Sequence, residues 1–237
     1  MSRGAEAGAP RPLSAPGFER VRCVLVPPLP AAELAGGLPW LTPAEQGFLA
    51  QLERPRRRAD WLAGRLAAKL ATRQALEEAV DLAQLSISYL AGGRPGATRR
   101  GARLPGLWLA ISHSGGFGLA AASSGPRPIG IDLERESGWA GELSAYALSP
   151  AERARLPAAA GEREVLAHWT LKEAALKALG LGLRVHPRRL EVEGDCSAPA
   201  AAARWRLAGR GPATGSGWFA HAGPFTWALA ESETRPG

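Results

Sequence analysis

Two acidic residues in the stretch IGIDLE have the spacing of a metal site. Asp132 and Glu134 are two residues apart on a predicted strand, so both side chains project from the same face. Two adjacent carboxylates repel each other unless a cation lies between them, and hard cations such as Mg²⁺ take oxygen ligands. The alternative is an exposed strand face whose acids pair with arginines, and the Asp-x-Glu pattern alone does not exclude it.

A second stretch, WTLKEAALK, places a carboxylate and two ammonium groups close together. Glu173 and Lys177 are four residues apart and share one face of a predicted helix, whereas Lys172 lies about 100° around it. The chain has only three lysines among its 29 basic residues, so two of them in one helix need a reason. Taken alone, an ordinary surface Glu–Lys pair contributing ~0.3–0.5 kcal/mol also explains the pattern.

Histidine and arginine side chains precede these carboxylates. The stretch ISHSGG puts Ser112 and His113 at the end of a predicted strand, without the G-x-S-x-G pattern of a hydrolase nucleophile. Arg94 lies in the loop GGRPG, where its guanidinium suits a phosphate or a base edge. The run RPRRRADW opens a predicted helix and is either a solvated basic cap or a nucleic-acid patch; its arginines are Arg54, Arg56, Arg57 and Arg58.

Composition narrows the class of protein. A chain of 237 residues forms one large domain or two small ones and can bury a sizeable core. The net charge of +7 and the pI near 10.4 favour acidic partners such as nucleic acid, phosphorylated cofactors or an acidic protein surface. Arginine is abundant throughout, so a generally basic protein is the alternative.

Cysteine usage and hydropathy bear on the compartment. Cys23 and Cys196 are isolated and lack metal-ligand spacing, so we infer neither a disulfide framework nor a zinc site. The first residues lack the apolar core of a signal peptide, and no apolar run reaches the roughly 18 residues of a membrane span. We therefore expect a cytoplasmic protein.

The hydrophobic pattern predicts helices packed on antiparallel strands, an α+β protein. Residues 1–17 are predicted to be a disordered tail, and residues 91–106 a loop. The strands are predicted over 20–29, 85–90, 107–114, 115–123, 129–134, 188–193, 203–209, 217–223 and 225–232. The helices are predicted over 41–52, 54–80, 148–156 and 168–180, the last ending at Gly180.

A short internal echo indicates two similarly built halves. The helix at Thr42 starts with Thr-Pro-Ala-Glu, an N-cap followed by proline at the first helical position and glutamate at the third. The same pattern returns as Ser-Pro-Ala-Glu at Ser149.

In chain order the motifs read RRRADWLAGR, GRP, ISHS, IGIDLE and WTLKEAALK. This series resembles the 4′-phosphopantetheinyl transferases of the larger, surfactin-synthetase-activating type. The resemblance runs from about residue 40 to 185. Its diagnostic pair, (I/V)-G-(I/V)-D-x-E and W-x-x-K-E-x-x-x-K, is intact.

The resemblance implies a pseudo-dimeric fold with the active site between two similar halves, each with an antiparallel sheet and helices. It divides the chain into the tail at 1–17, a coenzyme A-binding half at 18–127, and a half at 128–237 with the metal site and the catalytic helix. The implied reaction moves 4′-phosphopantetheine from coenzyme A to a serine of an apo carrier protein and releases adenosine 3′,5′-bisphosphate. Mg²⁺ is the implied cofactor, with Mn²⁺ as a substitute.

The resemblance also implies residue roles. Asp132, Glu134 and Glu173 would hold the metal, and Lys172 and Lys177 would contact the phosphates. The implied catalytic residues are Glu173, which would accept the serine proton, Asp132 and Lys177. The coenzyme A contacts would be Arg56, Arg57, Arg94, Ser112, His113, Lys172 and Lys177.

Two positions depart from the family pattern. Arg94 replaces the lysine often found in the family's G-K-P loop. Some relatives also place lysines early in the first helix, where this chain has Glu45 and Phe48.

The expected partners are an apo acyl or peptidyl carrier protein and coenzyme A. We expect a monomer, and we expect neither nucleic acid nor a membrane as a partner. The alternatives are a basic nucleic-acid-binding protein, another Mg²⁺-dependent phosphoryl transferase or nuclease, and a catalytically silent relative.

Overall fold

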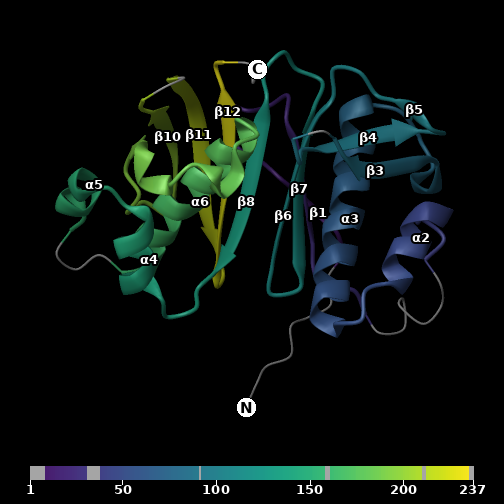
Figure 1. Ribbon diagram of the computed structural model, residues 1–237, viewed down its shortest axis with the longest axis horizontal. Helices are drawn as coiled ribbons and strands as arrows, with labels where there is room; N and C mark the ends of the chain where they lie inside the picture. The colour runs from purple at the N-terminus through teal and green to yellow at the C-terminus, as the bar shows by residue number, and fades with distance from the viewer. Residues whose placement is uncertain (1–8, 31–37, 91, 158–160, 210–211, 235–237) are drawn as a thin grey trace. The chain divides into compact units, whose positions relative to one another are not determined.

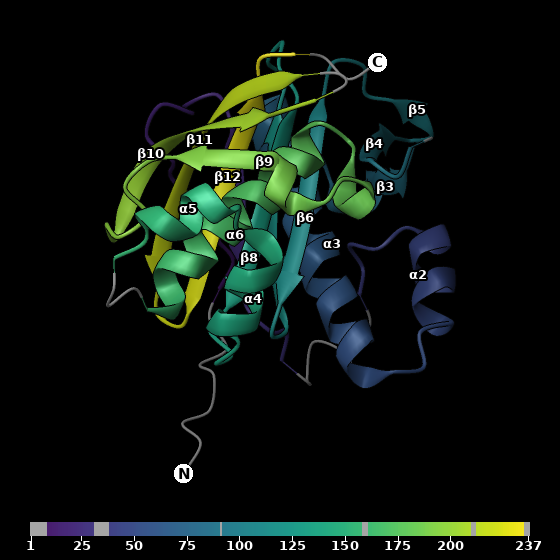
Figure 2. The ribbon, with the colours of Figure 1, turned by 60° about the vertical axis from the view of Figure 1, so that its left-hand side comes forward.

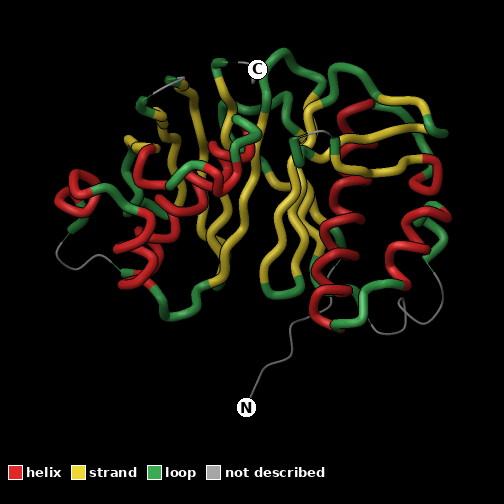
Figure 3. Tube along the Cα trace, in the orientation of Figure 1, coloured by secondary structure: helices red, strands yellow, loops and turns green. Residues whose placement is uncertain are grey.

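The computed structural model describes residues 9–30, 38–90, 92–157, 161–209 and 212–234. Helices and antiparallel strands both contribute, as Figure 3 shows, so the predicted α+β class is confirmed. The chain divides into two compact units. Unit 1 is Arg20–Ser124 with the described residues before Ala15, and unit 2 is Gly125–Gly237 with Ala15–Glu19. These bounds differ from the predicted ones at 17/18 and 127/128.

Unit 1 contains a four-stranded antiparallel sheet in the order β1-β2-β7-β6 and a small sheet in the order β3-β4-β5. The strands of the larger sheet are β1 (Arg11–Leu13), β2 (Arg22–Val26), β6 (Trp108–Ser114) and β7 (Phe117–Ser123). Those of the small sheet are β3 (Leu85–Tyr89), β4 (Pro95–Arg99) and β5 (Ala102–Arg103). The helices are α2 (Pro43–Ala50), α3 (Pro55–Leu76) and the single 3₁₀ turn η1 (Leu82–Gln84).

The helix α3 packs along β2, β7 and β6, and Figure 1 shows it beside β6 and β7. Its buried face is rich in alanine, which lets the backbones come close, and joins Val24 and Val26 of β2 in one apolar core. Gly118 on β7 is required here, because a Cβ atom would overlap the backbone of Ala63 and Gly64 in α3. Small residues therefore set the depth at which α3 lies on its sheet.

Unit 2 contains one five-stranded antiparallel sheet in the order β8-β12-β11-β10-β9. Its strands are β8 (Ile129–Arg135), β9 (Leu190–Glu193), β10 (Ala200–Leu207), β11 (Ala213–Ala222) and β12 (Phe225–Ser232). Its helices are α4 (Ala140–Ala147), α5 (Pro150–Arg155) and α6 (Glu162–Ala178), with the 3₁₀ turns η2 (Gly182–Arg184) and η3 (Pro187–Arg189).

The helix α6 lies against β8, β12 and β11, and Figure 2 shows it beside the sheet. Its end has the two bonds of a Schellman motif: the N–H of Gly180 donates to Lys177 O (3.0 Å) and that of Leu181 to Leu176 O (2.9 Å). Gly180 has φ +68°, so the predicted glycine stop is confirmed. Gly130 on β8 allows the helix to approach, because a Cβ atom there would overlap the carbonyl oxygen of Ala174.

The echo at Thr42 and Ser149 is structural. Both residues cap helices through capping boxes, α2 with Glu45 and α5 with Glu152. Each helix then leads to the long helix of its unit.

Two sequence predictions are wrong in part, and one helix was not predicted. The tail predicted over 1–17 includes β1, which pairs with β2, although residues 1–8 lie outside the described part of the chain. The loop predicted over 91–106 contains β4 and β5, because its arginines and threonine continue the ladder from β3. The helix α4 had no capping signal in the sequence and was not predicted.

Among the described helices, none has both the length and the apolar character that a membrane crossing needs.

Candidate functional site

The helix α6 presents a stripe of three functional side chains toward the carboxylates of β8. Trp169, Glu173 and Lys177 are spaced by four residues, so they share one face of the helix. On β8, Asp132 and Glu134 share a face because strand side chains alternate. The carboxylates that the sequence predicted to act together therefore lie together in unit 2.

Two donors on α6 hold the two carboxylates of β8. The ammonium of Lys177 donates to Asp132 Oδ1 (2.7 Å) and to the carbonyl oxygen of Ile131 (3.1 Å). One turn from Glu173 in the other direction, the indole N–H of Trp169 donates to Glu134 Oε1 (3.1 Å). Glu173 lies on the helix between these two donors.

The electrostatics of the cluster favour the protonated forms of Glu134 and Glu173. Burial, followed by the charge of Asp132, raises the pKa of Glu134 to about 7, although the bond from Trp169 and the charge of Lys177 oppose the shift. Burial and Asp132 likewise raise the pKa of Glu173 to about 7, against Lys177. A second cation would relieve this repulsion, because it favours the ionised form of every carboxylate near it.

The donor chemistry fits a hard divalent cation. All three side chains offer carboxylate oxygens, and Glu173 Oε1 is buried without a hydrogen-bond partner among the described residues. The described part of the chain has no group of three His, Cys, Asp or Glu side chains already at coordination spacing. The chemistry of these side chains suits a hard cation, but holding one would require the three carboxylates to draw closer together than they are here.

Lys172 does not belong to this cluster, and the prediction that it contacts phosphates is contradicted by its burial. Its side chain is 0 % exposed and pairs with Glu152 of α5 (Nζ to Oε2, 2.5 Å). Two carbonyl oxygens, of Ala147 (2.8 Å) and Pro187 (3.3 Å), accept its remaining N–H groups. Lying about 100° from Glu173 around α6, Lys172 points into the core of unit 2.

A cavity of about 660 Å³ in unit 1 collects three of the seven predicted coenzyme A contacts. Arg56 and Arg57 line it from α3, and His113 lines it from β6. Arg54 and the buried Arg65 add two more guanidinium groups, while Asp60 and Glu45 are the acids. A concave, cation-rich cavity suits a small anionic ligand better than it suits a nucleic-acid duplex.

The arginines at the start of α3 are placed against the helix dipole. Arg54 is the N-cap residue and makes no side-chain capping bond, and the first turn contains no acid. Positive charge at a helix N-terminus is unfavourable, whereas an anion there is stabilised by both the dipole and the guanidinium groups. The charge of this end of the cavity therefore favours a bound anion.

Two predicted contacts lie elsewhere. Ser112 is buried and does not line the cavity, because neighbours on a strand point to opposite faces and His113 takes the cavity face. Arg94 is also absent from the lining: its guanidinium lies 5.6 Å from the centre of the Trp108 ring, and burial lowers its pKa. The structure thus keeps Arg56, Arg57 and His113 together and separates Ser112 and Arg94 from them.

Sequence reasoning missed the aromatic wall of this cavity. The rings of Phe48 and Trp61 lie 5.4 Å apart, and the guanidinium of Arg65 lies 4.7 Å from the Trp61 ring. Tyr89 also lines the cavity and is largely exposed. Trp61 and Arg65 are four residues apart on a predicted helix, a spacing that signals contact, but their apolar neighbours made Trp61 look like ordinary core.

Comparison with known proteins agrees with the carboxylate cluster. Residues 128–228, less than half of the chain, match a family model described as the 4′-phosphopantetheinyl transferase superfamily. The matched segment contains β8 and α6, with all three carboxylates and Lys177. The match supports the resemblance at the level of the superfamily and phosphopantetheine transfer in general. No curated protein matches the chain.

Proposed function

We propose that this protein is a Mg²⁺-dependent 4′-phosphopantetheinyl transferase that modifies a serine of an apo carrier protein. The observation that carries the proposal is the cluster of Asp132, Glu134, Glu173 and Lys177, within the segment that matches the superfamily. Three carboxylates and an ammonium are suited to a pyrophosphate substrate, whose cleavage adds negative charge to a leaving phosphate.

In the proposed reaction the serine Oγ forms a bond to the phosphorus that carries the pantetheine arm. The bond from that phosphorus to the bridging oxygen of the pyrophosphate breaks, and adenosine 3′,5′-bisphosphate leaves. Glu173 accepts the serine proton, directly or through water. The pKa of about 7 applies to the metal-free protein, and a bound cation would favour the ionised carboxylate, which is the form that accepts a proton.

Asp132, Glu134 and Glu173 would hold the metal. When bound, Mg²⁺ would supply charge neutralisation at the pyrophosphate. Of the two lysines of α6, Lys177 is the one with access to a ligand, since its side chain is 28 % exposed while that of Lys172 is fully buried. We assign Lys177, without Lys172, to the phosphates.

The cavity of unit 1 would take the part of coenzyme A that carries the 3′-phosphate. Arg54, Arg56 and Arg57 supply charge at the start of α3, and His113 supplies an exposed imidazole on β6. Trp61 offers an aromatic face suited to a base.

Several finer features belong to the same proposal. We assign the chain to the larger, surfactin-synthetase-activating type, because its motifs extend into unit 1. Carriers of fatty-acid, polyketide or nonribosomal-peptide synthesis are the proposed substrates, and a basic protein would attract an acidic carrier electrostatically. A cytoplasmic location and a monomeric state complete the proposal.

The test is incubation with coenzyme A, Mg²⁺ and an apo carrier protein, followed by intact mass measurement. The carrier should gain one phosphopantetheine, and a carrier whose acceptor serine is replaced by alanine should gain none. Reactions without coenzyme A or with Asp132→Ala enzyme serve as controls. An unchanged carrier mass across carriers of all three pathways would overturn the proposal.

A further inference from the structure

Trp169 makes a polar contact that the proposed mechanism does not use. Its indole N–H donates to Glu134 Oε1 at 3.1 Å, across the gap between α6 and β8. Its ring also lies 5.9 Å from that of Tyr146 and packs against the apolar cluster around Leu148 and Val165. The side chain therefore has two parts: a ring held by packing and an N–H aimed at one carboxylate oxygen.

The packing alone does not require a tryptophan. Counted from the buried lysines Lys69 and Lys172, the residue of α3 that corresponds to Trp169 is Leu66. Leu66 joins the core of unit 1 with no polar atom. What the indole adds in unit 2 is a donor, and the donor reaches Glu134.

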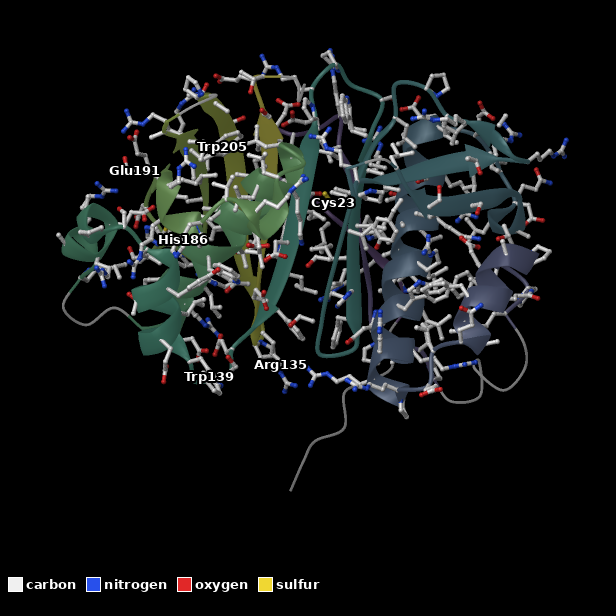
Figure 4. All side chains as sticks on the ribbon, in the orientation of Figure 1. Cys23, Arg135, Trp139, His186, Glu191 and Trp205 are labelled. Carbon is white, nitrogen blue, oxygen red and sulfur yellow. The ribbon has the colours of Figure 1, made fainter. Side chains whose placement is uncertain are left out.

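Two other indoles of unit 2, those of Trp205 and Trp218, make no such contact with a carboxylate in the described part of the chain. Trp205 donates its N–H to the carbonyl oxygen of Ser216 (3.2 Å) within the sheet, and Figure 4 shows it there. The indole nitrogen of Trp218 is buried without a hydrogen-bond partner among the described residues. Burial thus does not by itself direct an indole N–H to a carboxylate, whereas Trp169 is held where it meets one.

The contact of Trp169 is one of two that the helix α6 makes with the carboxylates of β8. Trp169 lies one turn before Glu173 and holds Glu134, and Lys177 lies one turn after Glu173 and holds Asp132. Each donor occupies one oxygen of its carboxylate and fixes where the other can point. The two β8 carboxylates are therefore oriented by α6, the helix that carries the third.

We propose that Trp169 is a positioning residue, which fixes Glu134 through one oxygen and so orients the other for the metal that Asp132, Glu134 and Glu173 would hold. The inference rests on the metal site of the proposed function. Partners that orient a metal ligand change metal affinity by about 10–100-fold when removed, and a single neutral N–H donor belongs at the lower end of that range. The residue acts on metal affinity and has no step of its own in phosphoryl transfer.

The test is the affinity for Mg²⁺ alone, measured by calorimetry without coenzyme A, in the wild-type chain and in Trp169→Phe. Phenylalanine keeps an aromatic ring against Tyr146 and removes the donor. We expect the Kd for Mg²⁺ to rise about tenfold. In the carrier assay, kcat should return to within about twofold of wild type once Mg²⁺ is raised above the new Kd.

Trp205→Phe is the matched control, because it removes an indole N–H bond of similar length in the same unit, to a backbone carbonyl instead of a carboxylate. It should lower the melting temperature and leave the Kd for Mg²⁺ unchanged. Should Trp169→Phe fail to fold by circular dichroism, Trp169→Leu decides the question, since it introduces the residue found at the corresponding position of unit 1.

Three results would count against the inference. An equal Kd for wild type and Trp169→Phe would overturn the positioning role and leave the proposed metal site standing. A loss of kcat that excess Mg²⁺ does not restore would give Trp169 another role. Transfer activity by a wild-type chain that binds no Mg²⁺ would overturn the metal site, and this inference with it, while the transfer reaction remained established.

Discussion

The two units of this protein follow one plan. In unit 1 the strand β2 is followed by the short capped helix α2 and the long helix α3, and in unit 2 the strand β8 is followed by α4, the short capped helix α5 and the long helix α6. In both units antiparallel strands come next. The long helix packs on three strands in both units, α3 on β2, β7 and β6, and α6 on β8, β12 and β11. The sheet orders β2-β7-β6 and β8-β12-β11 correspond strand by strand. The sheet continues through β10 and β9 in unit 2, whereas β3, β4 and β5 form a separate sheet in unit 1.

The correspondence extends to a buried ion pair. Lys69 pairs with Glu45 (2.5 Å) as Lys172 pairs with Glu152 (2.5 Å), and both lysine side chains are 0 % exposed. Each glutamate also closes a capping box and accepts the backbone N–H of a strand residue, Ile87 (3.1 Å) in unit 1 and Val192 (2.9 Å) in unit 2.

This pair explains why two lysines survive in an arginine-rich chain. The ammonium of Lys69 has three acceptors, one on Glu45 and the carbonyl oxygens of Trp40 (2.7 Å) and Leu82 (3.0 Å). Lys172 likewise has three. An ammonium has three N–H donors, so it is fully satisfied, whereas a guanidinium would bring five and leave some buried and unpaired.

The units differ where α3 packs on β2 and where α6 packs on β8. In unit 1 the strand contributes Val24 and Val26 to the core beneath α3. In unit 2 Asp132 and Glu134 lie on β8 beside α6. Counted from the buried lysines, the helix residues Leu66, Leu70 and Gln74 of α3 correspond to Trp169, Glu173 and Lys177 of α6. Unit 2 therefore replaces apolar packing with the proposed catalytic cluster.

The units also differ in the charge of a corresponding cavity. Unit 2 has a cavity of about 460 Å³ lined by Glu152, His168 and Val192, the counterparts of Glu45, Arg65 and Ile87. Its rim carries Glu164, Glu193 and Asp195, where the cavity of unit 1 carries arginines. The corresponding cavities of the two units thus carry opposite charge at their edges, arginines in unit 1 and mainly acids in unit 2. Residues common to both units maintain the fold, and residues that differ carry the proposed function.

The largest effect is expected at the shared ion pair. Lys69→Met and Lys172→Met should each lower the free energy of unfolding by about 3–5 kcal/mol, because each leaves a buried carboxylate without its cation. Denaturant unfolding measures the loss. Arg206→Met is the control, because its bridge to Glu191 is exposed and contributes at most about 1 kcal/mol. Losses near that of the control would show that the pair is not structural.

Asp132→Ala should lower activity and leave the stability of the fold largely unchanged, whereas the lysine substitutions lower stability. We expect transferase activity to fall by about 100-fold or more, because the metal loses a ligand, while the fold is kept because a repulsive buried charge is removed. The counterpart Val24→Ala should cost about 2 kcal/mol of stability and little activity per folded molecule. Wild-type turnover by Asp132→Ala at saturating Mg²⁺ would contradict the metal assignment.

A smaller effect is expected in the cavity of unit 1. His113→Ala should weaken coenzyme A binding about tenfold and dephospho-coenzyme A binding much less, because the imidazole would contact the 3′-phosphate that the second ligand lacks. Calorimetry with both ligands makes the comparison, and His186→Ala, on the exposed side chain labelled in Figure 4, is a control outside the cavity. Equal losses for the two ligands would assign His113 another role.

The last prediction is a pH dependence of the stability of the metal-free protein. Because burial and Asp132 raise the pKa of Glu134 and of Glu173 from 4.5 to about 7, the folded state holds protons that the unfolded state releases. These groups therefore make stability fall as pH rises from about 4.5 to 7. Added Mg²⁺ should raise the melting temperature more at pH 8 than at pH 5. Asp132→Asn should flatten the profile, and identical profiles for the two proteins would refute the coupling.

The sequence by itself determined the elements and the composition of the cluster. Periodicity placed all five strands of the sheet of unit 2 and the glycine stop at Gly180, because these signals depend only on neighbours in the chain. The Asp-x-Glu and Glu-x-x-x-Lys spacings put the right side chains on single faces for the same reason. The helix starts at Thr42 and Ser149 could also be predicted from the sequence.

Only the tertiary structure decided which way Lys172, Ser112 and Trp169 face. Lys172 looks like a companion of Lys177 in the sequence, yet the packing of α4, α5 and η3 supplies three acceptors that draw it into the core. Ser112 adjoins His113, but the pleat turns it to the buried face. The bond from Trp169 joins residues 35 positions apart, so it depends on how α6 lies on its sheet. Gly130 allows the close approach of α6, and no local sequence pattern predicts that contact.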